Sequence, residues 1–128
     1  MFKYDNYLKI PGALDFATAQ RLLEEIHTPA AEADPNFQEL WTDLAQTAVN
    51  YSSYRNRWNL ETQEERVADG SGRTFAHNAY LSCLESLARY MKKTWGATWM
   101  DELGTRADRK RLGDFAGYIV LFGVLQGR

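Results

Sequence analysis

The last stretch of the chain, residues 105–125, constrains the fold more than any other part of the sequence. Its second half, FAGYIVLFGVL from Phe115 to Leu125, contains no charged residue, and a helix that is apolar on every side must be enclosed by other elements. Thr105 and Asp108 have the spacing of a capping box, and the stretch is longer than a typical β-strand. We therefore predict a buried C-terminal helix at the centre of a helical bundle.

Further amphipathic helices are available to surround it. Apolar residues recur at helical spacing in three long segments, which predicts helices over residues 14–27, 35–58 and 73–95. The sequence has no internal repeat and no low-complexity tract that would mark a second domain. We expect an all-α fold, a single-domain bundle of five or six helices over residues 1–128 around a central apolar C-terminal helix.

Two segments are expected to interrupt the regular helices. Residues 1–12 end in a Pro-Gly pair, which breaks secondary structure, and we predict an extended arm that lies over the bundle. Thr62 and Glu65 form a capping box that predicts the start of a short helix. Because Asp, Gly and Ser favour turns, the run Asp69-Gly70-Ser71-Gly72 predicts a loop and the main hinge near residues 69–73.

Length and cysteine usage limit the class of protein. A chain of 128 residues can bury a core as one domain without disulfides. The single cysteine, Cys83, excludes an internal disulfide and fits a reducing compartment such as a bacterial-type cytosol. The first residues contain no apolar segment typical of a secretory signal, and the apolar run between Asp114 and Arg128 is too short to span a bilayer. We therefore expect a soluble, cytoplasmic protein.

Charge is unevenly distributed along the chain. Residues 1–72 carry 6 Lys and Arg against 12 Asp and Glu, whereas residues 73–128 carry 9 against 5. The first part therefore has a formal charge of −6 and the second of +4. Opposite net charges predict attraction between the two parts, either within one chain or across a homodimer. The overall balance also argues against a globally basic nucleic-acid binder.

One buried ion pair is predicted from two isolated charges. Arg55 occupies an apolar position of the second predicted helix, between Tyr51 and Trp58, and Asp114 is the last charge before the apolar run. Each would be desolvated without a partner. We predict that Arg55 and Asp114 meet inside the bundle and that Tyr118 donates a further hydrogen bond to the Asp114 carboxylate.

The same reasoning defines a candidate ligand site. His77 and Asn78 are polar residues near the start of the third long helix, and His77 is interpreted either as a general base in an aromatic-lined pocket or as a partly buried, hydrogen-bonded histidine. A small-molecule or enzyme site would combine this histidine with the predicted ion pair and its neighbours: Arg55, Trp58, Arg73, His77, Asn78, Asp114 and Tyr118.

A basic cluster before the apolar helix raises the possibility of nucleic-acid binding. Four basic residues follow the turn at Gly104, in the position of a helix-turn-helix recognition helix. The alternative is a solvated basic helix end, because the same helix becomes wholly apolar one turn later. The residues concerned are Arg106, Arg109, Lys110 and Arg111.

Metal, cofactor and catalytic motifs are not supported. Glu24 and His27 have the Glu-x-x-His spacing of di-iron bundles, but such a site needs a second copy, and the chain's other histidine is His77. No phosphate-binding loop, zinc spacing or Ser/His/Asp order is present. We therefore predict no metal, no cofactor and no catalytic residue. The leading hypothesis is a non-catalytic binding or regulatory module whose partner is an unidentified protein or a second copy of the chain.

Overall fold

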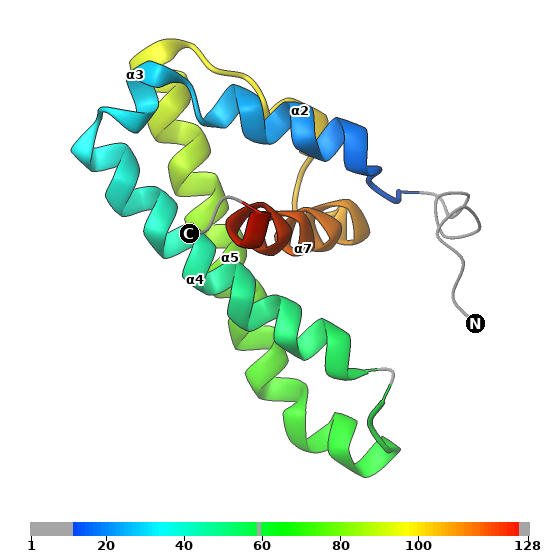
Figure 1. Ribbon diagram of the computed structural model, residues 1–128. Helices are drawn as coiled ribbons and strands as arrows, with labels where there is room; N and C mark the ends of the chain where they lie inside the picture. The colour runs from blue at the N-terminus through cyan, green and yellow to red at the C-terminus, as the bar shows by residue number, and fades with distance from the viewer. Residues whose placement is uncertain (1–11, 59, 126–128) are drawn as a thin grey trace.

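Two long helices, α4 (Pro35–Trp58) and α5 (Gln63–Trp95), form an antiparallel hairpin along which the rest of the chain is arranged (Figure 1). The computed structural model describes residues 12–58 and 60–125. Buried residues of α4 recur every three or four positions, which turns one stripe of the helix toward the core. This stripe contains Phe37, Trp41, Leu44, Ala48 and Tyr51.

The remaining helices of the described chain pack on one half of this hairpin. Helix α7 crosses α4, and α2 packs against α7, whereas the half of the hairpin near its connecting loop extends beyond both (Figure 1). The described residues contain no β-strand, and the predicted all-α bundle is confirmed. The bounds of these helices are α2 (Phe16–Ile26), α3 (Pro29–Glu32), α6 (Met100–Leu103) and α7 (Arg109–Leu125).

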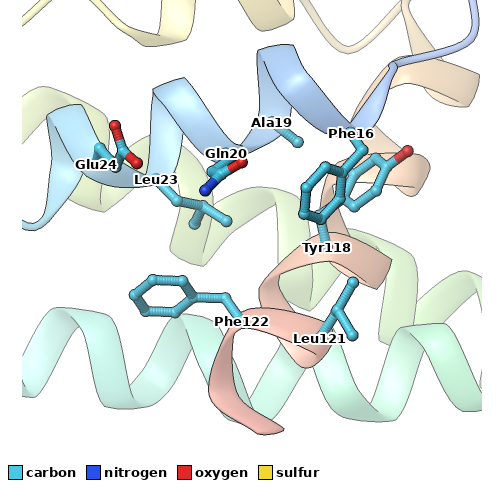
Figure 2. A pocket seen from close by; sticks show the side chains of 8 residues that line it. All are labelled: Phe16, Ala19, Gln20, Leu23, Glu24, Tyr118, Leu121 and Phe122. Atoms are coloured by element: carbon cyan, nitrogen blue, oxygen red, sulfur yellow. The ribbon is translucent and has the colours of Figure 1, made fainter. Parts of the chain in front are cut away.

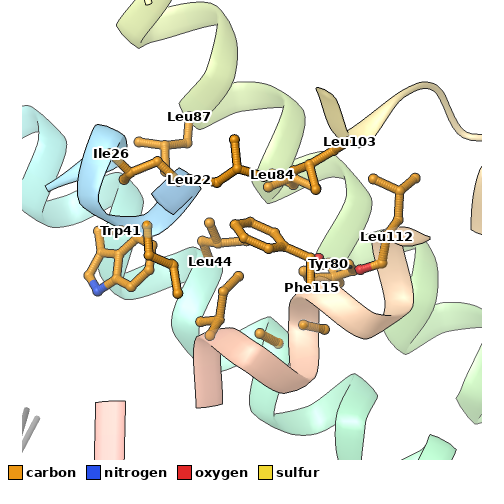
Figure 3. Packing of buried hydrophobic residues seen from close by; sticks show 14 of the residues in the cluster. Leu22, Ile26, Trp41, Leu44, Tyr80, Leu84, Leu87, Leu103, Leu112 and Phe115 are labelled. Carbon is orange, nitrogen blue, oxygen red and sulfur yellow. Dashed lines mark hydrogen bonds between the residues drawn. The ribbon is translucent and has the colours of Figure 1, made fainter. Parts of the chain in front are cut away.

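The core lies where the hairpin, α2 and the first half of α7 meet (Figure 3). Leu44 of α4, Leu84 of α5 and Phe115 of α7 are fully buried there. Tyr80 is also fully buried, and its hydroxyl donates a 2.7 Å hydrogen bond to the carbonyl oxygen of Leu112. Burial raises the pKa of Tyr80 well above its usual value, so this phenol remains a hydrogen-bond donor that joins α5 to α7.

Helix α7 is central, but the other helices of residues 12–58 and 60–125 leave part of it exposed. Its first half is buried, including Leu112, Phe115 and Ala116, whereas Leu121 is 40% exposed and Val124 is 72% exposed. We expected full enclosure because the sequence has no charge in this region. The structure differs because α2 is short and leaves one side of the last two turns of α7 uncovered.

The predicted loop and hinge near residues 69–73 is wrong, because α5 is continuous through Asp69-Gly70-Ser71-Gly72. A Cβ atom added to Gly72 would lie 2.7 Å from the hydroxyl oxygen of Tyr54 on α4. Gly72 therefore gives the Tyr54 side chain room against α5, rather than a turn. The packing of a long helix against its neighbour outweighs the low helix propensity of the glycines.

The predicted helix ends agree with the structure at α5 and differ at α7. Thr62 and Glu65 form the predicted capping box, in which each side chain accepts a hydrogen bond from the other residue's backbone N–H. The carboxylate of Asp108 accepts a 2.8 Å hydrogen bond from the backbone N–H of Thr105. This interaction closes a turn before the helix, so α7 begins at Arg109 rather than at Thr105.

The predicted arm over residues 1–12 lies outside the described residues except for Gly12, which has a positive φ of 86°. In the described part of the chain, no helix combines the length and apolar character needed to cross a membrane.

Replacing the two glycines of α5 by alanine should have different effects on stability. A Cβ at Gly70 meets no atom within 4 Å, so Gly70→Ala should raise the free energy of unfolding by about 0.5–1 kcal/mol. Gly72→Ala should raise the free energy of unfolding by less than Gly70→Ala does, or lower it, because the Tyr54 ring must move. Urea unfolding of both variants measures this, and equal gains would contradict the proposed contact with Tyr54.

Candidate functional site

The predicted ion pair between Arg55 and Asp114 is present and joins α4 to α7. An Nη2 hydrogen of Arg55 is donated to Oδ1 of Asp114 over 3.2 Å. The Asp114 side chain is 7% exposed and that of Arg55 is 31% exposed. The carboxylate is therefore buried, while part of the guanidinium reaches solvent.

Gly113 makes room for this arginine. A Cβ atom at position 113 would lie 2.8 Å from Cζ of Arg55 and 3.0 Å from its Nε, closer than real Cβ contacts. The guanidinium therefore lies directly against the backbone of α7. A side chain at Gly113 would displace Arg55 from Asp114.

The same carboxylate also anchors the start of the described chain. Oδ2 of Asp114 accepts a 3.0 Å hydrogen bond from the backbone N–H of Leu14. The hydroxyl of Tyr118 donates its hydrogen to the carbonyl oxygen of Leu14 over 2.9 Å, whereas we expected it to donate to the Asp114 carboxylate. Asp114 and Tyr118 hold both backbone groups of the fully buried Leu14, which fixes the residues that lead into α2.

His77 is buried but belongs to a neighbouring part of the core. It is 8% exposed, and its ring packs edge-to-face on Tyr51 at a centroid distance of 5.0 Å. Tyr51 in turn stacks on Tyr80. Burial lowers the pKa of His77, and the positive charges of Arg109, Arg106 and Arg73 lower it further. We infer that His77 is neutral near pH 7, and Asn78, the next residue, is exposed.

Trp58 and Arg73, also predicted for this site, lie together at the far end of the hairpin. The Arg73 guanidinium lies 4.4 Å above the Trp58 ring. Arg66, which the sequence did not single out, lies 4.7 Å from the same ring and donates from Nε to the Trp58 carbonyl oxygen over 2.9 Å. The ligand residues predicted together thus divide into an ion pair with its neighbour Tyr118, a buried histidine and an Arg–Trp–Arg stack.

The predicted basic residues lie before α7 and in its first turn, and they are partly engaged within the chain. Arg106 forms a two-pronged pair with Glu85, and Nε of Arg111 donates to the carbonyl oxygen of Glu102 over 2.7 Å. Arg109 is exposed, whereas Lys110 is half-buried. Nucleic-acid binding by these four residues stays a prediction, and the bonds of Arg106 and Arg111 within the chain compete with it.

An apolar groove lies between α2 and α7, at the uncovered end of α7 (Figure 2). It has a volume of about 140 Å³ and adjoins an edge-to-face contact between Phe16 and Tyr118, whose ring centroids are 6.0 Å apart. Exposed Gln20 and Glu24 supply polar groups along α2. The lining residues are Phe16, Ala19, Gln20, Leu23, Glu24, Tyr118, Leu121 and Phe122.

The wall of this groove is continuous with an aromatic cluster around His27. Phe122 stacks on the His27 ring at 4.8 Å, and Trp41 meets the ring edge-to-face at 4.2 Å. Nδ1 of His27 lies 2.5 Å from a carboxylate oxygen of Glu32. Glu24, the partner in the Glu-x-x-His spacing, is on the rim of the groove instead, and the described residues contain no group of three metal-ligating side chains.

Two residues of this groove, Glu24 and Tyr118, were singled out from the sequence, each for a reason unrelated to the groove. The available signal was the excess of apolar residues over 115–125, which exceeds what the eleven-residue α2 can cover. Comparison with known proteins does not assign a function to it: the chain matches no protein-family model, no curated protein and no solved structure.

The Asp114 carboxylate should matter more for stability than its arginine partner. Asp114→Ala leaves the buried N–H of Leu14 without its acceptor and removes a buried charge partner, so it should cost about 3–5 kcal/mol. Arg55→Ala should cost less, because the guanidinium is partly solvated. Chemical unfolding of both variants and the double mutant measures this, and the double loss should fall well below the sum. Additive losses would show that the two side chains do not interact.

Acid should destabilise the fold through His77. Its folded-state pKa is below its ordinary value of about 6.5, so the unfolded chain binds more protons as pH falls. The contribution of neutral His77 to the free energy of unfolding is fully present above pH 6.5 and is lost as pH falls through the folded-state pKa. NMR titration should give a midpoint below 6.5, and His77→Gln should flatten the stability profile between pH 7 and that midpoint. A midpoint above 6.5 would contradict the burial argument.

Proposed function

We propose that this chain is a non-catalytic protein-binding module whose α2–α7 groove takes one large apolar side chain from a partner. The observation that carries this proposal is the uncovered apolar end of α7, where Leu121 is 40% exposed beside a hollow of about 140 Å³. A cavity of about 150 Å³ holds a benzene-sized molecule. The groove therefore has room for one aromatic or leucine side chain.

The charge at the rim supports a positively charged neighbour to that side chain. Arg21 on α2 forms ion pairs with Glu25 and Glu102, so its charge is largely neutralised. Glu24 lies on the groove side of the same helix and is exposed. A partner segment with Lys or Arg next to its apolar anchor would complement this rim.

The groove is also suited to binding because its walls are held in place before any partner arrives. Asp114 and Tyr118 fix Leu14 just before α2, which positions Phe16 two residues later. Preorganised walls reduce the entropy cost of association. The lining offers a carboxylate, an amide and a phenol that already donates to Leu14, which supports binding rather than a nucleophile–base pair. The single Cys83 fits a reducing compartment, and we propose that the module acts in the cytoplasm.

Selection of peptides from a random displayed library tests this proposal. We expect the enriched peptides to share one Phe, Trp or Leu next to Lys or Arg, with micromolar affinity. Leu121→Asp should weaken the selected peptides at least tenfold, because it places a charge in the apolar groove. With the Glu24→Lys variant, the selected peptides should no longer carry Lys or Arg next to the apolar residue.

Val49→Asp provides the matched control, because Val49 is exposed on α4 and does not line the groove. Binding of the selected peptides should survive this change. Enriched peptides that bind the Leu121→Asp variant as well as the natural chain would contradict the proposed site, as would a selection that yields no shared sequence.

A further inference from the structure

The outer face of α5 carries an exposed stripe without charge. Between positions 67 and 82 the exposed residues are all uncharged, whereas the charged residues of this segment, Asp69 and Arg73, are half-buried. Arg73 is turned toward α4, where it stacks on Trp58. The uncharged stripe consists of Val67, Ala68, Ser71, Thr74, Phe75, Asn78 and Ser82.

This stripe has the composition of an interface rather than of an ordinary surface. A quarter of the chain is charged, and exposed surfaces usually hold at least that share. Phe75 is 75% exposed and Val67 is 72% exposed, and both lie on this face. Loss of charge combined with an exposed aromatic residue distinguishes the centre of protein–protein interfaces. Over its fifteen helical steps the stripe is about 22 Å long.

The stripe fits a second copy of itself in antiparallel orientation. In a two-fold contact centred on Phe75, position 68 of one copy lies level with position 82 of the other, because both are seven residues from the centre. Ala68 and Ser82 are both exposed residues of the stripe, so these two small side chains would meet at about 10 Å from the axis.

The charges that end the stripe are complementary in this arrangement. Glu64 precedes the stripe by one turn, and Arg89 follows it by two turns; both are exposed and share its side of the helix at a period of 3.6 residues. Antiparallel pairing places Glu64 opposite position 86, within one turn of Arg89 of the other copy. A parallel arrangement would instead place like charges together.

We propose that this chain forms a two-fold homodimer in which the α5 stripes pack antiparallel with Phe75 at the axis. A single helix face is smaller than a standard interface, which buries about 800 Å² per partner, so the dimer is reversible with a dissociation constant of about micromolar order. This surface is separate from the α2–α7 groove, and the dimer does not depend on the function proposed for the groove.

Cysteine cross-linking tests the register of the contact. In a Cys83→Ser background, Phe75→Cys should form a covalent dimer under mild oxidation at least tenfold faster than Val49→Cys, a control on α4 whose native valine is 54% exposed. In the same background, the double variant Ala68→Cys, Ser82→Cys should form a disulfide between position 68 of one copy and position 82 of the other, because the two positions lie level on the facing stripes. Mass spectrometry identifies that bond. Equal rates at positions 75 and 49, or no bond between positions 68 and 82 of different copies, would overturn the proposal.

Sedimentation tests the association without cross-links. Phe75→Glu should raise the dissociation constant more than tenfold by placing two like charges at the axis. Thermal unfolding followed by circular dichroism, at a concentration well below the dissociation constant of the natural chain, should stay unchanged because Phe75 is exposed. Arg89→Glu should weaken the dimer several-fold, and Glu64→Lys in the same chain should restore it. A natural chain that is monomeric at several hundred micromolar, or a dimer indifferent to Phe75→Glu, would overturn the proposal.

Discussion

The arrangement of the helices depends on one carboxylate. Asp114 accepts from Arg55 of α4 through one oxygen and from the backbone of Leu14 through the other. A buried carboxylate is costly unless its oxygens are satisfied, so these two partners are required by the burial of α7 itself. Asp114 thus joins α7 both to α4 and to the residues that lead into α2, with Gly113 providing the space that Arg55 needs.

The groove follows from the same arrangement. Because Leu14 is held against α7, α2 begins directly beside Tyr118, and its eleven residues end before they cover the last turns of α7. Leu121 and Phe122 then form one wall of the hollow, and Phe16 and Leu23 form the other. The hydrogen bonds that hold Leu14 therefore both stabilise the fold and set where the apolar surface is left exposed. They tie the proposed binding surface to the rigid part of the fold.

Much of the fold could be predicted from the sequence, because helical periodicity is a local signal. The stripe of α4, the capping box at Thr62 and the isolated charges Arg55 and Asp114 all indicated structure that is present. The continuity of α5 could not be predicted, because Gly72 looks like a turn residue until Tyr54 of the facing helix is known. The groove was missed for a related reason. Periodicity shows which residues are apolar and favour burial, but the length and angle of the covering helix decide which of them are buried.

The continuity of α5 through its two glycines has a consequence for motion. Gly70 and Gly72 have the lowest helix propensity in the 33-residue helix, and Trp58 is stacked by Arg66 before them and by Arg73 after them. The stack therefore holds α5 together across the two glycines, and local opening of the hairpin end requires the stack to break. The uncharged stripe begins on one side of these glycines, at Val67, and continues on the other, at Phe75. A molecule docked along the whole stripe would bind only the closed helix, so docking and opening would oppose one another by mass action.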